Sequence, residues 1–301
     1  TYDRGLAADL VLGTFRNRNC IDLVIHKVSD VVVERISPEL INILRMGVYE
    51  LVYCPDREIY AVVSETMKLT SRMAAKQKGF VNAILRKMSR LIVDRSASFA
   101  SARHTKTIPV SPDSGCRFDI EILPDPANEP AAYLAAVFSL PQWLVDGWIE
   151  SYGFKDAMQA CFGSNRRPSV YVRPNTLKCS GIELYERFQK NAVECEIVID
   201  EGWVLQTRGG RAVENLPGFD EGCFSVQDLT ASEAVRAIGL QPGWNVLDIC
   251  AAPGGKTIQI AQLMGDKGKI AATDFDAARL QRVRENITRM GIKSVEIVHY
   301  A

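Results

Sequence analysis

The chain has 301 residues, enough for two or three domains, and it is 47% hydrophobic and 24% charged, as expected of a folded protein. Lys and Arg total 36 and Asp and Glu total 36, so net charge indicates no polyanionic partner. No apolar run reaches the ~18 residues of a membrane span. The eight cysteines are scattered, without C-x-x-C pairs and without His nearby at metal-ligand spacing, so the spacing indicates no metal site. We expect reduced thiols, a cytoplasmic location, no metal and a monomer.

Residues 1–95 have the three-to-four spacing of buried helix faces. Ser37-Pro38 begins one helix, because Pro suits the first helical position, and Cys54-Pro55 ends it. A further helix is predicted from about Ala61 to Met73. Gly79 is expected to interrupt the pattern before a last helix over 80–91.

Basic residues gather in the second half of this helical segment. No acid occurs over residues 66–93, and Lys68, Arg72 and Lys76 follow an i, i+4, i+8 spacing that predicts one helix face. Such a face, with Arg86 nearby, is suited to RNA phosphates. An ordinary solvated surface fits the same spacing, and the two interpretations are about equally supported.

Residues 96–130 are rich in Ser, Pro, Asp and Gly, which predicts a linker or surface extension with a small hairpin near 118–122. Residues 131–226 are expected to form a small α/β module. Its first helices should bury Trp143, Val145 and Trp148. Its strands are predicted at 169–173, 196–199, 203–206 and 223–226, with one helix over 181–189, as in ferredoxin-like or RNA-recognition modules. Arg173, at a strand end, could meet RNA phosphate or pair with a local acid.

The stretch Trp244–Thr257 carries the strongest signal. Val246 and Leu247 lead into Asp248, a small-residue turn follows, and an apolar-periodic helix begins at Lys256-Thr257. A strand, glycine turn and helix in this order open a doubly wound sheet, whose ligands bind at the carboxyl ends of its strands. A further helix over 277–290 and a third strand over 295–298 are predicted to follow.

Three ligands compete for this turn. A phosphate loop would need Gly where Cys250 stands, and the dinucleotide pattern G-x-G-x-x-G is absent. A methyl-donor site needs an acid after the next strand to hold the ribose hydroxyls, and Asp274 follows the predicted strand 269–273. The sequence therefore favours S-adenosylmethionine.

The strings C-A-A-P-G-G-K and T-D-F-D-A-A-R-L resemble the first two cofactor motifs of the RNA 5-methylcytosine methyltransferases, most of all the bacterial 16S ribosomal RNA type (RsmB, Sun or Fmu). L-R-M-G-V-Y-E-L-V-Y and G-F-V-N-A-I-L-R-K resemble its NusB-like RNA-binding domain, and S-V-Y-V-R-P-N-T its R-x-N strand. The resemblance implies that these residues contact the cofactor: Cys250, Ala251, Ala252, Pro253, Gly254, Gly255, Lys256 and Asp274.

Methyl transfer to cytosine C5 requires a thiolate that adds to C6. The family's two cysteines follow Pro and Thr in later strands, and none of the eight cysteines has that setting. We therefore expect the nucleophile beyond Ala301, and a truncated, inactive chain that also lacks the family's first helices. Three predicted strands alone would leave an unpaired sheet edge.

The predicted protein is multidomain. Residues 1–95 form a NusB-like helical domain, 96–130 an extension, 131–226 the small α/β module and 227–301 the start of a Rossmann-like methyltransferase domain. The expected activity is S-adenosylmethionine-dependent cytosine-C5 methylation of RNA, with 16S ribosomal RNA as partner. The alternative is a non-catalytic NusB-like RNA-binding protein with a vestigial methyltransferase part.

Overall fold

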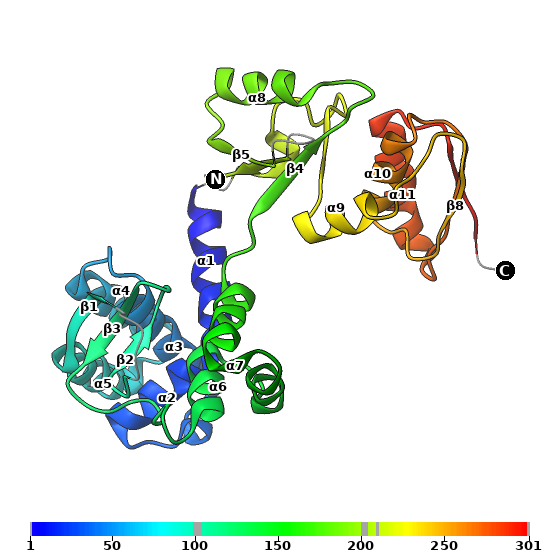
Figure 1. Ribbon diagram of the computed structural model, residues 1–301. Coiled ribbons are helices and arrows are strands. Elements are labelled where there is room, and N and C mark those ends of the chain that lie inside the picture. The colour runs from blue at the N-terminus through cyan, green and yellow to red at the C-terminus, as the bar shows by residue number, and fades with distance from the viewer. Residues whose placement is uncertain (1, 99–103, 200–203, 209–210, 300–301) are drawn as a thin grey trace. The chain divides into compact units, whose positions relative to one another are not determined.

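The computed structural model describes residues 2–98, 104–199, 204–208 and 211–299. They form two compact units, Thr1–Arg166 and Arg167–Ala301 (Figure 1). Within the described residues, no helix is both long and apolar enough to cross a membrane.

The first unit consists of helices that pack on one another and on a small antiparallel sheet with strand order β1-β3-β2. Its helices are α1 (Tyr2–Arg16), α2 (Arg18–Ser29), α3 (Pro38–Tyr53), α4 (Ile59–Met73), α5 (Lys78–Leu91), α6 (Pro130–Phe138) and α7 (Gln142–Asn165), with 3-10 turns η1 (Val33–Arg35) and η2 (Ala75–Gln77). Its strands are β1 (Ile92–Ser98), β2 (Thr107–Pro109) and β3 (Ser114–Phe118).

The predicted start of α3 is confirmed, with Pro38 in its first turn and Cys54 at its C-cap. The predicted interruption at Gly79 is wrong. The chain leaves α4 at Ala74 and passes through η2, and Gly79 lies inside α5, where a Cβ would meet nothing within 4 Å. A single exposed Gly costs a helix only about 1 kcal/mol, which the buried face of α5 offsets.

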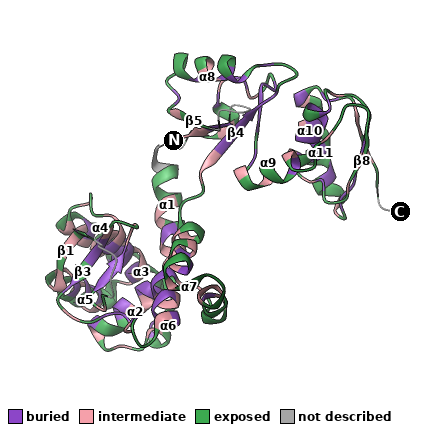
Figure 2. Cartoon of the chain, viewed as in Figure 1, coloured by how far each residue is buried: buried purple, intermediate pink, exposed green. Residues whose placement is uncertain are grey.

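Residues 96–130 are not a surface extension. Ile108, Cys116 and Ile122 are fully buried in one core with α2 and α3, and Figure 2 shows this burial along the sheet. The predicted hairpin near 118–122 is also misplaced, since Phe118 ends β3. The strands were hard to predict because they are short and rich in Ser and Gly, whose side chains carry little apolar pattern.

Helices α6 and α7 pack with the first unit, whereas the sequence assigned them to the module that follows. Val145 is buried as predicted, but Trp143 is 74% exposed and is not a core residue. Gly153, with φ of +77°, kinks α7. Trp143 and Val145 are two residues apart and therefore lie on different faces of the helix, so both could not face the same core.

The second unit begins with a four-stranded antiparallel sheet of order β5-β6-β4-β7, as expected for an α/β module with one helix. Its elements are β4 (Val170–Pro174), α8 (Gly181–Lys190), β5 (Cys195–Ile199), β6 (Val204–Thr207), η3 (Val213–Asn215) and β7 (Phe224–Val226). Ser180 and Glu183 close a reciprocal capping box at the start of α8, and these hydrogen bonds lower the pKa of Glu183. Phe188 and Phe224 pack edge to face in the module's core.

A parallel sheet of order β10-β9-β8 follows, with α10 and α11 packed on one face. The elements are α9 (Leu229–Arg236), β8 (Asn245–Asp248), α10 (Gly255–Leu263), β9 (Lys269–Ala272), α11 (Ala277–Met290) and β10 (Val295–Ile297). Asp228 caps α9, and Gly291, at φ of +73°, ends α11. The other face of the sheet leaves Leu247 65% exposed.

Arg95 ties β1 to the end of α3. Its guanidinium donates to the carbonyls of Leu51 and Glu50, both at 2.8 Å, and to those of Cys54, Pro55 and Arg57. The last carbonyls of a helix lack intrahelical partners and carry the negative end of its dipole, so a cation there supplies both donors and charge.

Replacing Arg95 should therefore loosen α3. Arg95→Met is expected to speed hydrogen exchange of the α3 amides at least about tenfold, since charge-assisted hydrogen bonds contribute roughly 1.5–3 kcal/mol each. Mass spectrometry of peptides covering residues 38–53 measures this, with Arg117→Met, at an exposed position of β3, as the matched control. Equal exchange in the two variants would contradict a capping role.

Candidate functional site

The candidate site lies where β8 and β9 end. The two strands run parallel, and Asp248 pairs with Ala272 at their last positions. The turn after β8 and residues Thr273 and Asp274 after β9 therefore meet at the carboxyl edge of the sheet. Ala251 N–H donates to the Thr273 carbonyl (3.0 Å), and Thr273 N–H donates to the Asp248 carbonyl (2.9 Å). This is the place where doubly wound sheets bind ligands.

Asp248 holds the inner side of the turn. Its carboxylate accepts a hydrogen bond from the buried Thr257 hydroxyl (2.7 Å) and from Cys250 N–H (3.3 Å). Thr257 lies in the first turn of α10, so this pair fixes the start of the helix relative to the end of β8. Gly254 has φ of +107°, a backbone conformation that side chains rarely adopt, and it begins the helix.

Asp274 holds the outer side and is only 3% exposed. Its carboxylate accepts from Ala252 N–H (3.2 Å), from Asp276 N–H (3.4 Å) and from the guanidinium of Arg279 (3.2 Å). The Arg279 side chain is 44% exposed, so this ion pair is in contact with solvent through Arg279 and not through Asp274. Asn286, on the same helix as Arg279, donates to the Pro253 carbonyl (2.9 Å).

The structure brings together all the residues that the sequence assigned to a cofactor. Ala251 and Gly254 are buried, Ala252 and Gly255 are half-buried, and Cys250, Pro253 and Lys256 are exposed beside Asp274. Sequence reasoning missed Arg279 and Asn286. Arg279 is part of the T-D-F-D-A-A-R-L string. Its hydrogen bond to Asp274 depends on where α11 begins, and that start is set by the cap at Asp276.

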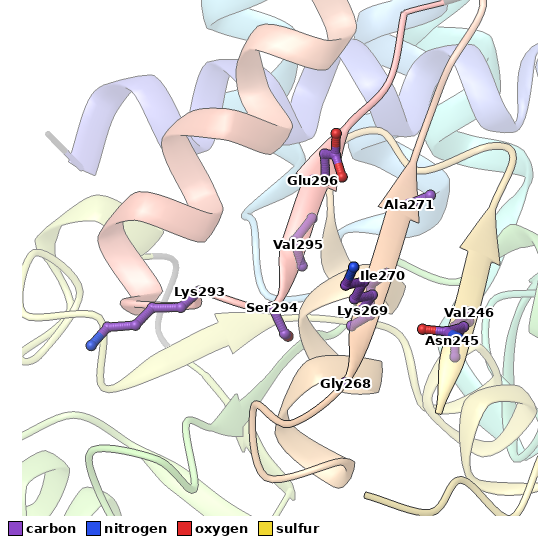
Figure 3. Close-up of a pocket in the computed structure, with 10 residues that line it drawn as sticks. All are labelled: Asn245, Val246, Gly268, Lys269, Ile270, Ala271, Lys293, Ser294, Val295 and Glu296. Carbon is purple, nitrogen blue, oxygen red and sulfur yellow. The ribbon is translucent and has the colours of Figure 1, made fainter. Parts of the chain in front are cut away.

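A hollow of about 690 Å³ lies elsewhere, over the starts of the parallel strands (Figure 3). Asn245, Lys269 and Ser294 line it, and neither the turn after β8 nor Asp274 does. Because ligands of such sheets bind at the carboxyl ends, this hollow is not the candidate site.

Arg173 is not at the surface, so neither expectation for it, RNA phosphate or a local acid, holds. It is 6% exposed, and its guanidinium donates to Gln227 (2.8 Å), Ser225 (3.2 Å) and Gln262. Burial, with nearby Arg236 adding to it, lowers the pKa of Arg173 to about 10, so the side chain stays charged at neutral pH. A buried cation is thus held by neutral oxygens alone among the described residues.

These contacts continue onto α10. Gln227 donates to Gln259 (2.6 Å), and Gln259 donates to the hydroxyl and carbonyl of Ser232 on α9 (2.9 and 3.0 Å). Gln262 donates to Asn175 (2.9 Å), which in turn donates to the Met290 carbonyl at the end of α11 (2.9 Å). Buried polar groups need such partners. The helix that starts at the candidate site is therefore fixed by β4, α9 and α11 together.

Arg289 makes a second link between the module and α11. Its guanidinium lies 4.1 Å from the centre of the Phe219 ring and donates to the carbonyls of Phe219 (2.8 Å) and Phe224 (3.2 Å). Burial lowers the pKa of Arg289.

The predicted basic face is only partly formed. Lys68 and Arg72 are exposed on α4, but Lys68 pairs with Glu65 (2.6 Å). Lys76 lies in η2, beyond the end of α4, and does not continue the helical stripe. Arg86 is exposed on α5 and donates to Asn82 (3.2 Å).

The cysteines offer no evident nucleophile. Burial raises the pKa of Cys20, Cys161 and Cys179 to about 11 and that of Cys116 to about 12, so these thiols are protonated at neutral pH. Cys250 is exposed in the turn. Over the described residues, no cluster of His, Cys, Asp and Glu could hold a metal ion.

Comparison with known proteins matches each part of the chain. The NusB family matches residues 1–90, a ferredoxin-like domain of RsmF/B-like methyltransferases matches 140–209, and the 16S rRNA methyltransferase RsmB/F family matches 235–301. The three matched stretches of this chain are thus similar to NusB, RsmF/B ferredoxin-like and RsmB/F methyltransferase domains. The predicted fold class is thereby confirmed.

Two curated relatives align with nearly the whole chain. A probable ribosomal RNA small subunit methyltransferase B of Synechocystis is 28% identical over 98% of this chain and 60% of its own length. The ribosomal RNA small subunit methyltransferase B of Pseudomonas syringae is 30% identical over 96% of this chain and 58% of its own length. The chain thus spans about three fifths of the relatives that it matches. A solved methyltransferase homologue from Pyrococcus horikoshii is 27% identical, covers 57% of this chain and 56% of its own, and has a TM-score of 0.52.

The buried network around Arg173 yields a prediction. Arg173→Lys should speed hydrogen exchange of the α10 amides at least about tenfold, because a compact ammonium group cannot reach three separate acceptors and leaves some of them unpaired. Peptides covering residues 255–263 report the effect, and α3 should be unchanged. The exposed Arg208→Lys, which alters a pair with Glu196 on the same module, is the control. Protection of α10 that equals the wild type would contradict the role given to Arg173.

Proposed function

We propose that this chain carries the S-adenosylmethionine site of an RNA methyltransferase that modifies cytosine C5 in small-subunit ribosomal RNA. The observation that carries the proposal is the buried carboxylate of Asp274 beside the small-residue turn at the carboxyl edge of the sheet. The names of the two relatives described above, both ribosomal RNA small subunit methyltransferases B, supply the substrate class. A purely RNA-binding role is not favoured, because the match extends through the turn and α11.

The residues present fit the cofactor. Asp274 is held in place by Ala252 N–H and Arg279, and a carboxylate can accept from two ribose hydroxyls as well. Gly254 and Gly255 have no side chain to block the approach of a ligand to the turn, and the unpaired N–H groups at the start of α10 favour an anionic group. Bound there, the cofactor would supply an electrophilic methyl group on sulfur. Cys250 to Lys256 would hold it, and Asp274 would orient its ribose.

The proposed methyl acceptor is cytosine C5, as the family resemblance implies. Cytosine C5 becomes nucleophilic only after a thiolate adds to C6, and the protonated, buried cysteines described above are poor candidates for that step. Lys68, Arg72, Lys76 and Arg86 remain proposed contacts to RNA phosphate, whereas Arg173 acts inside the protein.

The test of the cofactor site is Asp274→Asn, which keeps the shape of the side chain and removes its charge. Charge-assisted hydrogen bonds to the ribose should be lost, so calorimetry is expected to show S-adenosylmethionine binding weakened about tenfold or more. Glu296→Gln, an equal charge change on exposed β10, should bind as the wild type does. If the α10 amides of Asp274→Asn exchange at the wild-type rate and its affinity for S-adenosylmethionine is also unchanged, Asp274 is not part of the cofactor site.

A further inference from the structure

A second hollow, of about 580 Å³, lies between α4 and α5 in the first unit. Ile59, Tyr60, Val63, Ser64 and Met67 line it from α4, and Asn82, Arg86, Ser89 and Arg90 line it from α5. Its volume falls in the range of about 300–1,000 Å³ that suits small ligands or a single group of a larger one.

The lining combines three kinds of chemistry. Ile59, Val63 and Met67 are half-buried and form an apolar floor. Tyr60, which also lines the hollow, is 85% exposed, an unusual position for a large aromatic side chain. Asn82 and the two serines offer hydrogen-bond donors and acceptors to a polar edge.

The charge of the hollow is positive. Arg86 and Arg90 are both exposed, and no acid among the described residues forms an ion pair with either of them. The nearest acids along α4 are Glu58, which precedes the helix, and Glu65, which is paired with Lys68. An occupant with negative charge is therefore complementary to this hollow.

We propose that this hollow binds an unpaired nucleotide of single-stranded RNA. Aromatic side chains stack on unstacked bases, and arginines contact the adjacent phosphates. The ring of Tyr60 takes the base, Asn82 and the serines meet its polar edge, and Arg86 and Arg90 hold the backbone. A duplex does not enter, because its bases are already stacked. This inference rests on the proposed RNA substrate, and it adds a base contact in the hollow between the helices to the phosphate contacts proposed above.

The experiment measures binding of the full 301-residue chain to a fluorescent single-stranded RNA of mixed sequence and to a duplex of the same length. Tyr60→Ala should weaken single-strand binding about tenfold, the effect typical of losing one stacked base, while Tyr60→Phe keeps the wild-type affinity. Arg86→Gln with Arg90→Gln should flatten the logarithmic salt dependence by about 1.4, two contacts at roughly 0.7 each. The controls are Tyr152→Ala and Lys155→Gln, exposed positions of the same unit outside the hollow.

Binding of S-adenosylmethionine, measured on the same variants, should not change, so a failed cofactor site and a failed hollow are distinguished. Three results would overturn the proposal. Tyr60→Ala could bind single strands as well as Tyr152→Ala does. The wild type could bind duplex as well as single strands. The variant with both Arg86→Gln and Arg90→Gln could keep the wild-type salt dependence of RNA binding, in which case the hollow would bind a protein segment instead of RNA.

Discussion

The position of α10 is the constraint on which the second unit depends. This helix starts at the candidate cofactor turn, and its buried Gln259 and Gln262 are held by side chains from β4 and from the segment that follows β7. Arg173 is the centre of these contacts, a buried cation satisfied only by neutral oxygens among the described residues. Removing one member of such a network is destabilising, because each buried donor or acceptor left without a partner costs about 1–3 kcal/mol of folding free energy. The small module and the parallel sheet therefore keep the turn in one place.

The same principle operates at a smaller scale in the turn. Asp248 accepts from Cys250 N–H and Asp274 accepts from Ala252 N–H, so both carboxylates hold the turn and glycine at 254 does not make it loose. A ligand that comes to Asp274 meets a carboxylate that is already oriented, which reduces the ordering cost of binding. The carboxylate is buried yet remains close to solvent through Arg279, an arrangement that serves recognition better than stability.

The sequence predicted what depends on local pattern. The turn from Cys250 to Lys256 could be located because strand, small residues and helix follow one another directly, and Asp274 because it ends the next strand. The role of Arg173 could not be predicted, since its partners Gln227 and Gln262 are 54 and 89 residues away. Polar residues at buried helix positions were the available signal, because Gln259 and Gln262 interrupt the apolar face of α10. Lys76 was misplaced because the i, i+4, i+8 spacing was extended past Met73, where the predicted helix and α4 both end.

The central claim is that the turn after β8 and Asp274 together hold S-adenosylmethionine. A crystal structure of the chain with S-adenosylhomocysteine, the product that lacks the methyl group, tests it most directly. We predict density against residues 250–256, with the ribose hydroxyls within hydrogen-bond distance of the Asp274 carboxylate and α10 unmoved. Ligand bound over the strand starts near Lys269, or an Asp274 that contacts only Ala252, Asp276 and Arg279, would contradict the account.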